Sequence, residues 1–119
     1  MMISLVCLLL VLVPGGRDKE SPVFACNLGA LTKDERATHG RLAEALLAAV
    51  AERRELANGY GFRLPAAELE TASRWVALES RCCPFFSFEL RLAAQGGPLW
   101  LHITGPEGVK PFMRAEFGL

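Results

Sequence analysis

The fold is decided by one stretch of the sequence, which reads FSFELRLAAQGGPLWLHIT at residues 86–104. Apolar residues occupy every second position on both sides of its centre, as they do in strands that bury one face. These apolar positions are Phe86, Phe88, Leu90 and Leu92 before the centre, and Leu99, Leu101 and Ile103 after it. Between the two halves, Gln95-Gly96-Gly97-Pro98 has the composition of a turn. The stretch therefore predicts an antiparallel hairpin.

A second hairpin is predicted earlier in the chain, around Asn58-Gly59. Asn-Gly is the strongest two-residue hairpin signal, because both central positions of a type I′ turn need positive φ. The strand that follows has apolar residues at Tyr60, Phe62 and Leu64, which alternate with glycine or arginine. We expect one face of this strand to be buried.

The first helix is predicted between about Thr32 and Arg54. Thr32 and Glu35 have the spacing of a capping box, in which the hydroxyl and the carboxylate each accept from the other residue's backbone amide. Apolar residues then recur at helical spacing, for example at Leu42 and Leu46. Two arginines at positions 53 and 54 suit the negative end of a helix.

Two more helices are predicted after the hairpins. One runs from about Ala66 to Cys82, where it ends because Pro84 disfavours helical geometry at the residue before it. The last begins near Lys110, since Pro111 is tolerated only in a first helical turn. The order α-ββ-α-ββ-α predicts an α+β fold, with one four-stranded antiparallel sheet of two hairpins and helices on one face.

Length and composition favour one packed domain. The chain has 119 residues, of which 51% are hydrophobic, enough for a single core. Lys plus Arg and Asp plus Glu number 13 each, so no basic field is present to hold nucleic acid by its phosphates. We expect a single α+β domain over residues 24–119 that binds no nucleic acid.

The N-terminal residues 1–23 are expected to be a tail, disordered or signal-like. An apolar run at residues 3–13 is shorter than the roughly 20 residues that a spanning helix needs, so we expect no stable membrane span. The run has the length of a signal-peptide core, but no basic residue precedes it. We expect a cytoplasmic protein, with secretion as the alternative if residues 1–25 act as a signal peptide.

The four cysteines are Cys7, Cys26, Cys82 and Cys83. Their spacing does not resemble the framework of a small disulfide scaffold, so we expect reduced thiols. Cys82 and Cys83 fall at the predicted C-terminal end of a helix, where unpaired carbonyl groups disfavour a thiolate and raise a thiol pKa. The pair is therefore a poor nucleophile, and we expect a domain that is not an enzyme.

A soft metal ion changes this balance, because it removes the thiol protons itself. No CxxC spacing is present to indicate zinc. Linear or trigonal soft ions such as Hg(II), Cu(I) or As(III) need only two or three sulfurs, so Cys82, Cys83 and Cys26 form the candidate site. Glu79 and His39 are conceivable auxiliary ligands.

Three alternatives remain open. The cysteines can be inert packing residues, because free cysteine is among the most buried residue types. The protein can instead dimerise through the open sheet face near Trp100, which alternation places beside His102 and opposite the core. A thiol redox function is the third alternative. A catalytic role for His102 is disfavoured, since no acid and nucleophile visibly converge on it.

Several short motifs carry a resemblance to a known family. They are Cys26 and the segments 31–36, 58–62, 78–85, 88–90 and 101–105. Together they resemble an uncharacterised bacterial domain with a Cys-Cys-Pro-Phe motif, found with regulators and transporters of mercury and other heavy metals. The resemblance covers about residues 24–117. It implies that Cys82, Cys83 and Cys26 are the matching thiols, in a heavy-metal context.

Overall fold

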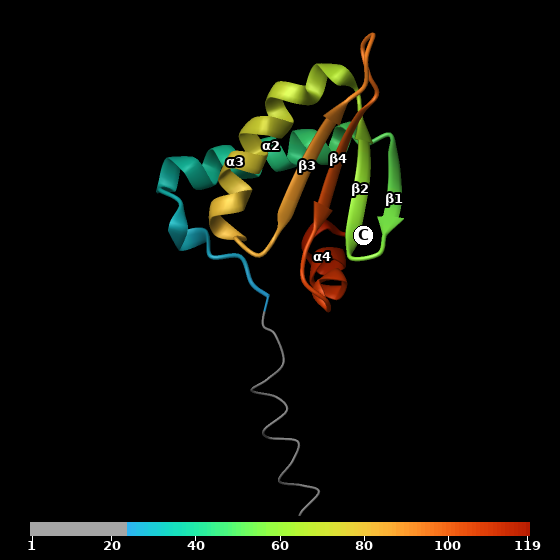
Figure 1. Cartoon of the computed structure of the whole chain (residues 1–119). Coiled ribbons are helices and arrows are strands. Elements are labelled where there is room, and N and C mark those ends of the chain that lie inside the picture. The colour runs from blue at the N-terminus through green and yellow to red at the C-terminus, as the bar shows by residue number, and fades with distance from the viewer. Residues whose placement is uncertain (1–23) are drawn as a thin grey trace, which may run out of the picture.

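One antiparallel sheet organises residues 24–119, which are the residues that the computed structural model describes. Its strands are β1 (Glu52–Leu56), β2 (Gly59–Leu64), β3 (Ser87–Leu92) and β4 (Leu99–Thr104), in the spatial order β1-β2-β4-β3. The helices are α2 (Lys33–Ala49), α3 (Leu69–Cys82) and α4 (Val109–Phe117), with short 3₁₀ helices η1 (Leu28–Ala30) and η2 (Ala66–Glu68). Figure 1 shows the helices gathered on one side of the sheet. The predicted fold and element order are confirmed, whereas the expectations for residues 1–23 lie outside the described residues.

The two hairpins join through β2 and β4, which lie side by side at the centre of the sheet. Leu101 of β4 is opposite Phe62 on one side and Leu90 on the other. The alternation read from the sequence therefore places these side chains on one face, the face that the helices cover. The core also includes Trp75 of α3 and Met113 of α4, both buried.

The first hairpin turns at a different place from the one predicted. Its two turn residues are Ala57 and Asn58, and Gly59 is already in β2, opposite Leu56. None of Ala57, Asn58 and Gly59 has a positive φ, so the turn is not type I′. Gly59 is required for another reason: a Cβ there would collide with the carbonyl oxygen of Ile103 in β4.

The first helix ends earlier than predicted, at Ala49, and both arginines lie in β1. Val50 is extended, and the Ala51 amide already donates to the Arg63 carbonyl at 2.8 Å. Residues 51–56 favour a helix by composition, but antiparallel pairing with β2 gives this segment backbone hydrogen bonds at alternate residues. Tertiary pairing thus overrides local propensity.

The other predicted element boundaries lie close to the observed ones. α3 ends at Cys82, and Cys83 has left helical geometry with φ −127° and ψ 71°, as Pro84 requires. The turn before β4 contains positive φ at Gln95, Gly96 and Gly97. α4 begins at Val109, one residue before the predicted start.

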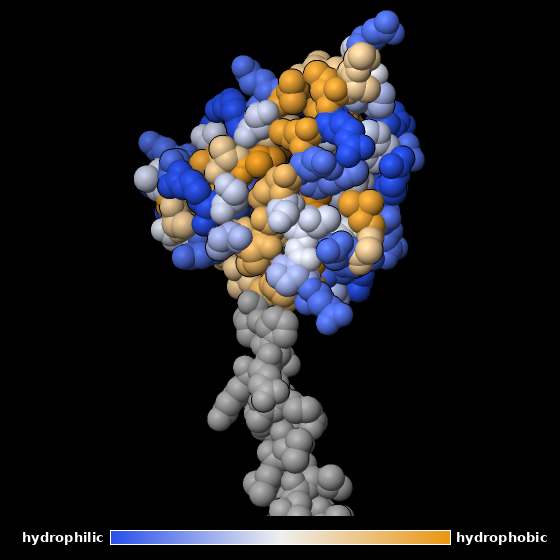
Figure 2. Space-filling model, viewed as in Figure 1, coloured by the Kyte–Doolittle hydropathy of each residue, from blue (hydrophilic) through white to orange (hydrophobic). Residues whose placement is uncertain are grey.

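The surface of this unit mixes apolar and charged groups. Figure 2 shows apolar residues gathered in the upper and central part of the view, over α3 and β3, with charged residues around them. Within residues 24–119, every helix falls short of the length and apolar character that a membrane crossing needs.

Candidate thiol and metal site

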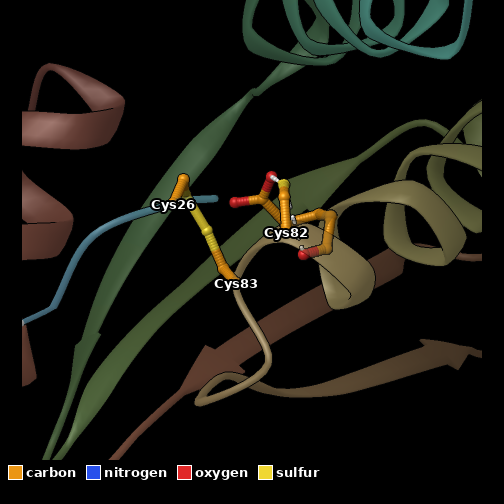
Figure 3. Close-up of side chains that lie close together, drawn as sticks. Cys26, Cys82 and Cys83 are labelled. Atoms are coloured by element: carbon orange, nitrogen blue, oxygen red, sulfur yellow. Dashed lines mark hydrogen bonds between the residues drawn. A yellow bond between two sulfur atoms is a disulfide. The ribbon is translucent and has the colours of Figure 1, made fainter. Parts of the chain in front are cut away.

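The site forms where the segment before α2 crosses the C-terminal end of α3. The Asn27 amide donates a 2.7 Å hydrogen bond to the carbonyl of Cys82. A disulfide bond joins Cys26 to Cys83, with the two Cα atoms 4.8 Å apart. Figure 3 shows this bond, with Cys82 beside it. Two segments that are 57 residues apart in sequence are therefore locked together at this point.

Arg81 adds a third connection between the same two segments. Its guanidinium donates to both carboxylate oxygens of Glu35, at 2.8 and 3.1 Å, and to the carbonyl of Ala30 at 3.0 Å. Glu35 also closes the predicted capping box by accepting from the Thr32 amide at 2.9 Å. The hydrogen bonds from Arg81 and Thr32 lower the pKa of Glu35 to about 2. The helix cap and the thiol region are thus fixed to each other by one carboxylate.

The disulfide corrects the expectation of reduced thiols. Sequence spacing gave no sign of it, because the partner of Cys83 is remote in sequence and not its neighbour Cys82. The contacts of Asn27 and Arg81 bring Cys26 onto the end of α3, where its sulfur reaches Cys83. Among residues 24–119, Cys82 is the free cysteine.

Cys82 is fully buried beside Glu79, one helical turn earlier. Its Sγ lies 3.5 Å from Glu79 Oε1 and 3.6 Å from the Glu79 carbonyl oxygen. Burial, followed by the charge of Glu79 and the hydrogen bond to it, raises the pKa of Cys82 to about 12. The predicted direction of the shift is therefore the one found, and burial is its main cause.

Glu79 is a buried acid with one satisfied and one unsatisfied oxygen. Its side chain is 1% exposed, and its Oε1 lies 2.6 Å from His39 Nε2. Oε2 is also buried and has no hydrogen-bond partner within residues 24–119. The His39 ring stacks on the Trp75 ring with centroids 6.2 Å apart, which restrains the orientation of the imidazole. A buried carboxylate oxygen without a donor is a place where a cation or a hydrogen-bond donor is stabilising.

The structure brings all three predicted thiols together. One ligand atom from each of Cys26, Glu79, Cys82 and Cys83 lies within 4.8 Å of the others. Glu79, predicted as an auxiliary ligand, is therefore inside the cluster. His39 contacts the cluster through Glu79. Metal binding by these residues stays a prediction.

Glu116 of α4 is a neighbour that sequence reasoning missed. Its Oε2 lies 3.5 Å from Cys26 Sγ. This is a contact and not a hydrogen bond while Cys26 is in the disulfide, since no S–H is present. Desolvation and the charge of Glu79 raise the pKa of Glu116. No motif marks this glutamate, because only the packing of α4 brings it to the thiols.

Trp100 and His102 lie on the opposite side of the sheet and take no part in the cluster. Trp100 is half-buried, and the guanidinium of Arg54 lies 4.1 Å above its ring. His102 Nδ1 is 3.2 Å from Glu89 Oε1. The aromatic surface predicted for a dimer is thus covered in part by the chain's own side chains, and the dimer stays a prediction.

Comparison of the chain with protein-family models, with curated proteins and with solved structures finds no match. The resemblance to the heavy-metal-associated domain therefore remains an expectation, carried by the motifs alone.

Proposed function

We propose that the protein binds one soft metal or metalloid ion through Cys26, Cys82 and Cys83 when the Cys26–Cys83 bond is reduced. The observation that carries the proposal is the convergence of three sulfurs and a Glu79 oxygen within 4.8 Å. Two adjacent cysteines cannot easily enclose an ion by themselves. Cys26, from a segment remote in sequence, adds a third sulfur ligand to the adjacent pair.

The spacing of these atoms suits a small coordination sphere. Metal–thiolate bonds of about 2.3 Å, the length found for zinc, place the sulfurs of a trigonal site about 4 Å apart. The four ligand atoms already lie within 4.8 Å of one another. Reduction of the disulfide frees two of the sulfurs, and small side-chain rotations then suffice to close the site.

The protonation of Cys82 favours soft ions over hard ones. Because the pKa of Cys82 is about 12, the thiol is protonated at neutral pH. An ion must displace that proton to bind. Thiophilic ions such as Hg(II), Cu(I) and As(III) gain the most free energy from the metal–sulfur bond that replaces it. The Glu79 carboxylate beside the sulfur adds a negative charge that partly balances the cation.

The disulfide makes binding depend on the redox state. In an oxidising compartment, Cys26 and Cys83 are joined and only Cys82 retains a thiol. A reducing cytoplasm, the location expected from the sequence, keeps thiols available. The proposal therefore places the metal-binding form in a reducing compartment.

Titration of the reduced protein tests this proposal. We start from a Cys7→Ser chain, so that Cys7 contributes no thiol, and add Cu(I) or Hg(II) without oxygen in the presence of a competing chelator. One equivalent should bind. Cys26→Ser, Cys82→Ser and Cys83→Ser should each weaken binding at least about tenfold, since even loss of an outer-shell partner costs 10–100-fold. Equal affinity in the oxidised parent, or in all three variants, contradicts the proposal.

The disulfide also supports a second candidate, a thiol redox function. In that case Cys26 and Cys83 accept two electrons and two protons from an external dithiol, which becomes a disulfide. Cys26 is a partly exposed residue whereas Cys83 is buried, so in this candidate function the reductant approaches from the Cys26 side. The raised pKa of Cys82 argues against this thiol as a nucleophile in such exchange. Rapid reduction by dithiothreitol without any metal binding would favour this candidate over the first.

A further inference from the structure

A small cavity lies between the helices and the helix-covered face of the sheet. Its volume is about 100 Å³. Apolar side chains from α2, β2, β4 and α4 form its walls, among them Leu46, Phe62, Leu64, Leu101, Ile103 and Phe117. One end is polar, because His39, Glu79 and Glu116 also line it. The cavity is therefore shaped for a molecule that is mostly apolar with a polar group at one end.

Two residues of the lining each have a buried polar atom that lacks a partner within residues 24–119. These atoms are the carboxylate oxygen Oε2 of Glu79 and the indole Nε1 of Trp75. Both side chains are more than nine-tenths buried, at 1% and 5% exposure. They lie four residues apart on α3, so they are neighbours on one face of the helix. One atom needs a donor and the other needs an acceptor.

We infer that this cavity binds a small, mainly apolar molecule that carries one hydroxyl group. A hydroxyl is the simplest group that both donates and accepts. It donates to Glu79 Oε2, accepts from Trp75 Nε1, and leaves its carbon chain against the apolar walls. This site goes beyond the proposed metal function, because it needs no thiol and exists in the disulfide form.

The polar groups at this end of the cavity distinguish between head groups. An ammonium group is attracted by Glu79 and Glu116 but has no acceptor, so it leaves the Trp75 indole unpaired. A carboxylate brings a further negative charge next to Glu79 and Glu116. A neutral hydroxyl satisfies both buried atoms and adds no charge.

The size of the cavity limits the length of the ligand. An apolar cavity of about 150 Å³ holds benzene, so one of about 100 Å³ holds about four non-hydrogen atoms. Leu47, a lining residue that is 51% exposed, marks the side on which a ligand enters. Straight-chain alcohols of three or four carbons are the best match.

Titration of the oxidised full chain with 1-alkanols from methanol to hexanol tests the inference. Affinity should rise about fourfold per methylene up to three or four carbons, and then stop rising or fall. In a Trp100→Phe chain, which retains a single indole, the Trp75 Nε1–H resonance should shift downfield in proportion to occupancy. 1-Aminobutane, whose ammonium group has no acceptor, should leave this resonance without a downfield shift.

Two matched variants complete the test. Ala43→Leu narrows the cavity and should reduce butanol binding at least about tenfold, whereas Ala48→Leu, on the exposed part of the same helix, should leave it unchanged. The inference is overturned if no alcohol binds saturably, which leaves water alone between the two atoms. It is also overturned if the amine shifts the Trp75 resonance as butanol does, or if Ala43→Leu binds butanol like the parent.

Discussion

The molecule contains two histidine–glutamate pairs, one on each side of the sheet. On the helix side, His39 and Glu79 are 2.6 Å apart, with side chains 15% and 1% exposed. On the open side, His102 and Glu89 are 3.2 Å apart, and Glu89 is 55% exposed. The residue types are the same, but water reaches the second carboxylate and not the first.

The contrast shows how burial changes what a carboxylate does. Glu89 is shared between His102 and Arg91, and water can replace either contact. Glu79 instead raises the pKa of the neighbouring Cys82 and leaves one oxygen without a donor. The helix side is also the side that holds the disulfide and the cavity. Chemistry beyond folding is therefore expected on the helix side, while the Glu89 carboxylate on the open side is solvated.

The largest expected effect comes from reducing the disulfide, since this removes the covalent connection of the helix side. Closing a loop with a sequence separation of 57 residues is worth about 4 kcal/mol in the chain-entropy description. Urea unfolding of the Cys7→Ser chain with and without reductant should show a loss of about this size. A Cys26→Ser variant should match the reduced protein and no longer respond to reductant. An unchanged unfolding midpoint would mean that the bond does not hold the segment.

Removing each glutamate in turn compares the two pairs directly. Glu79→Ala should lower the free energy of unfolding by about 3 kcal/mol, because a buried pair loses one partner and a space is left. Glu89→Ala should change it by less than about 1 kcal/mol, as expected for an exposed pair. Chemical denaturation of the two variants gives both values. Equal losses would show that the two environments do not differ as described.

An effect confined to alkaline solution is a loss of stability caused by Cys82. The thiol has a pKa of about 12 in the folded protein against an ordinary value of 9.0. Between these values the unfolded chain loses the proton that the folded chain keeps, so stability falls as pH rises. The stabilisation is complete below about pH 9 and is lost by about pH 12.

Comparison of the parent with Cys82→Ala isolates this effect, because the other groups titrate alike in both chains. The difference in unfolding free energy between them should be constant below pH 9 and should shrink above it. A difference that grows with pH would mean that the Cys82 thiolate is stabilised by the fold rather than disfavoured.

Local patterns were enough to predict most of the fold. The alternation around residues 86–104, the Thr32–Glu35 capping box and the stop before Pro84 each depend on neighbouring residues only. β1 was missed in part because its residues favour a helix, and only pairing with β2 makes them a strand. Local sequence patterns cannot predict secondary structure that depends on pairing with a segment elsewhere in the chain.

The residues of the candidate site also differ in whether local sequence patterns predict them. Cys82 and Cys83 are adjacent, and Glu79 precedes Cys82 by one helical turn, so sequence placed these three together. Cys26 was proposed as a third ligand, but its bond to Cys83 depends on how Asn27 and Arg81 hold the first segment on α3. The position of Glu116 beside Cys26 depends on how α4 packs, and no sequence motif predicts it.

The number of sulfur ligands around a bound ion is the most direct test of the central claim. X-ray absorption spectroscopy on the reduced Cys7→Ser chain, loaded with one equivalent of Hg(II), reports that number. Three sulfurs in the parent and two in Cys26→Ser are the expected results. Two sulfurs in both chains would show that Cys26 is not a ligand, and would contradict a site built from both segments.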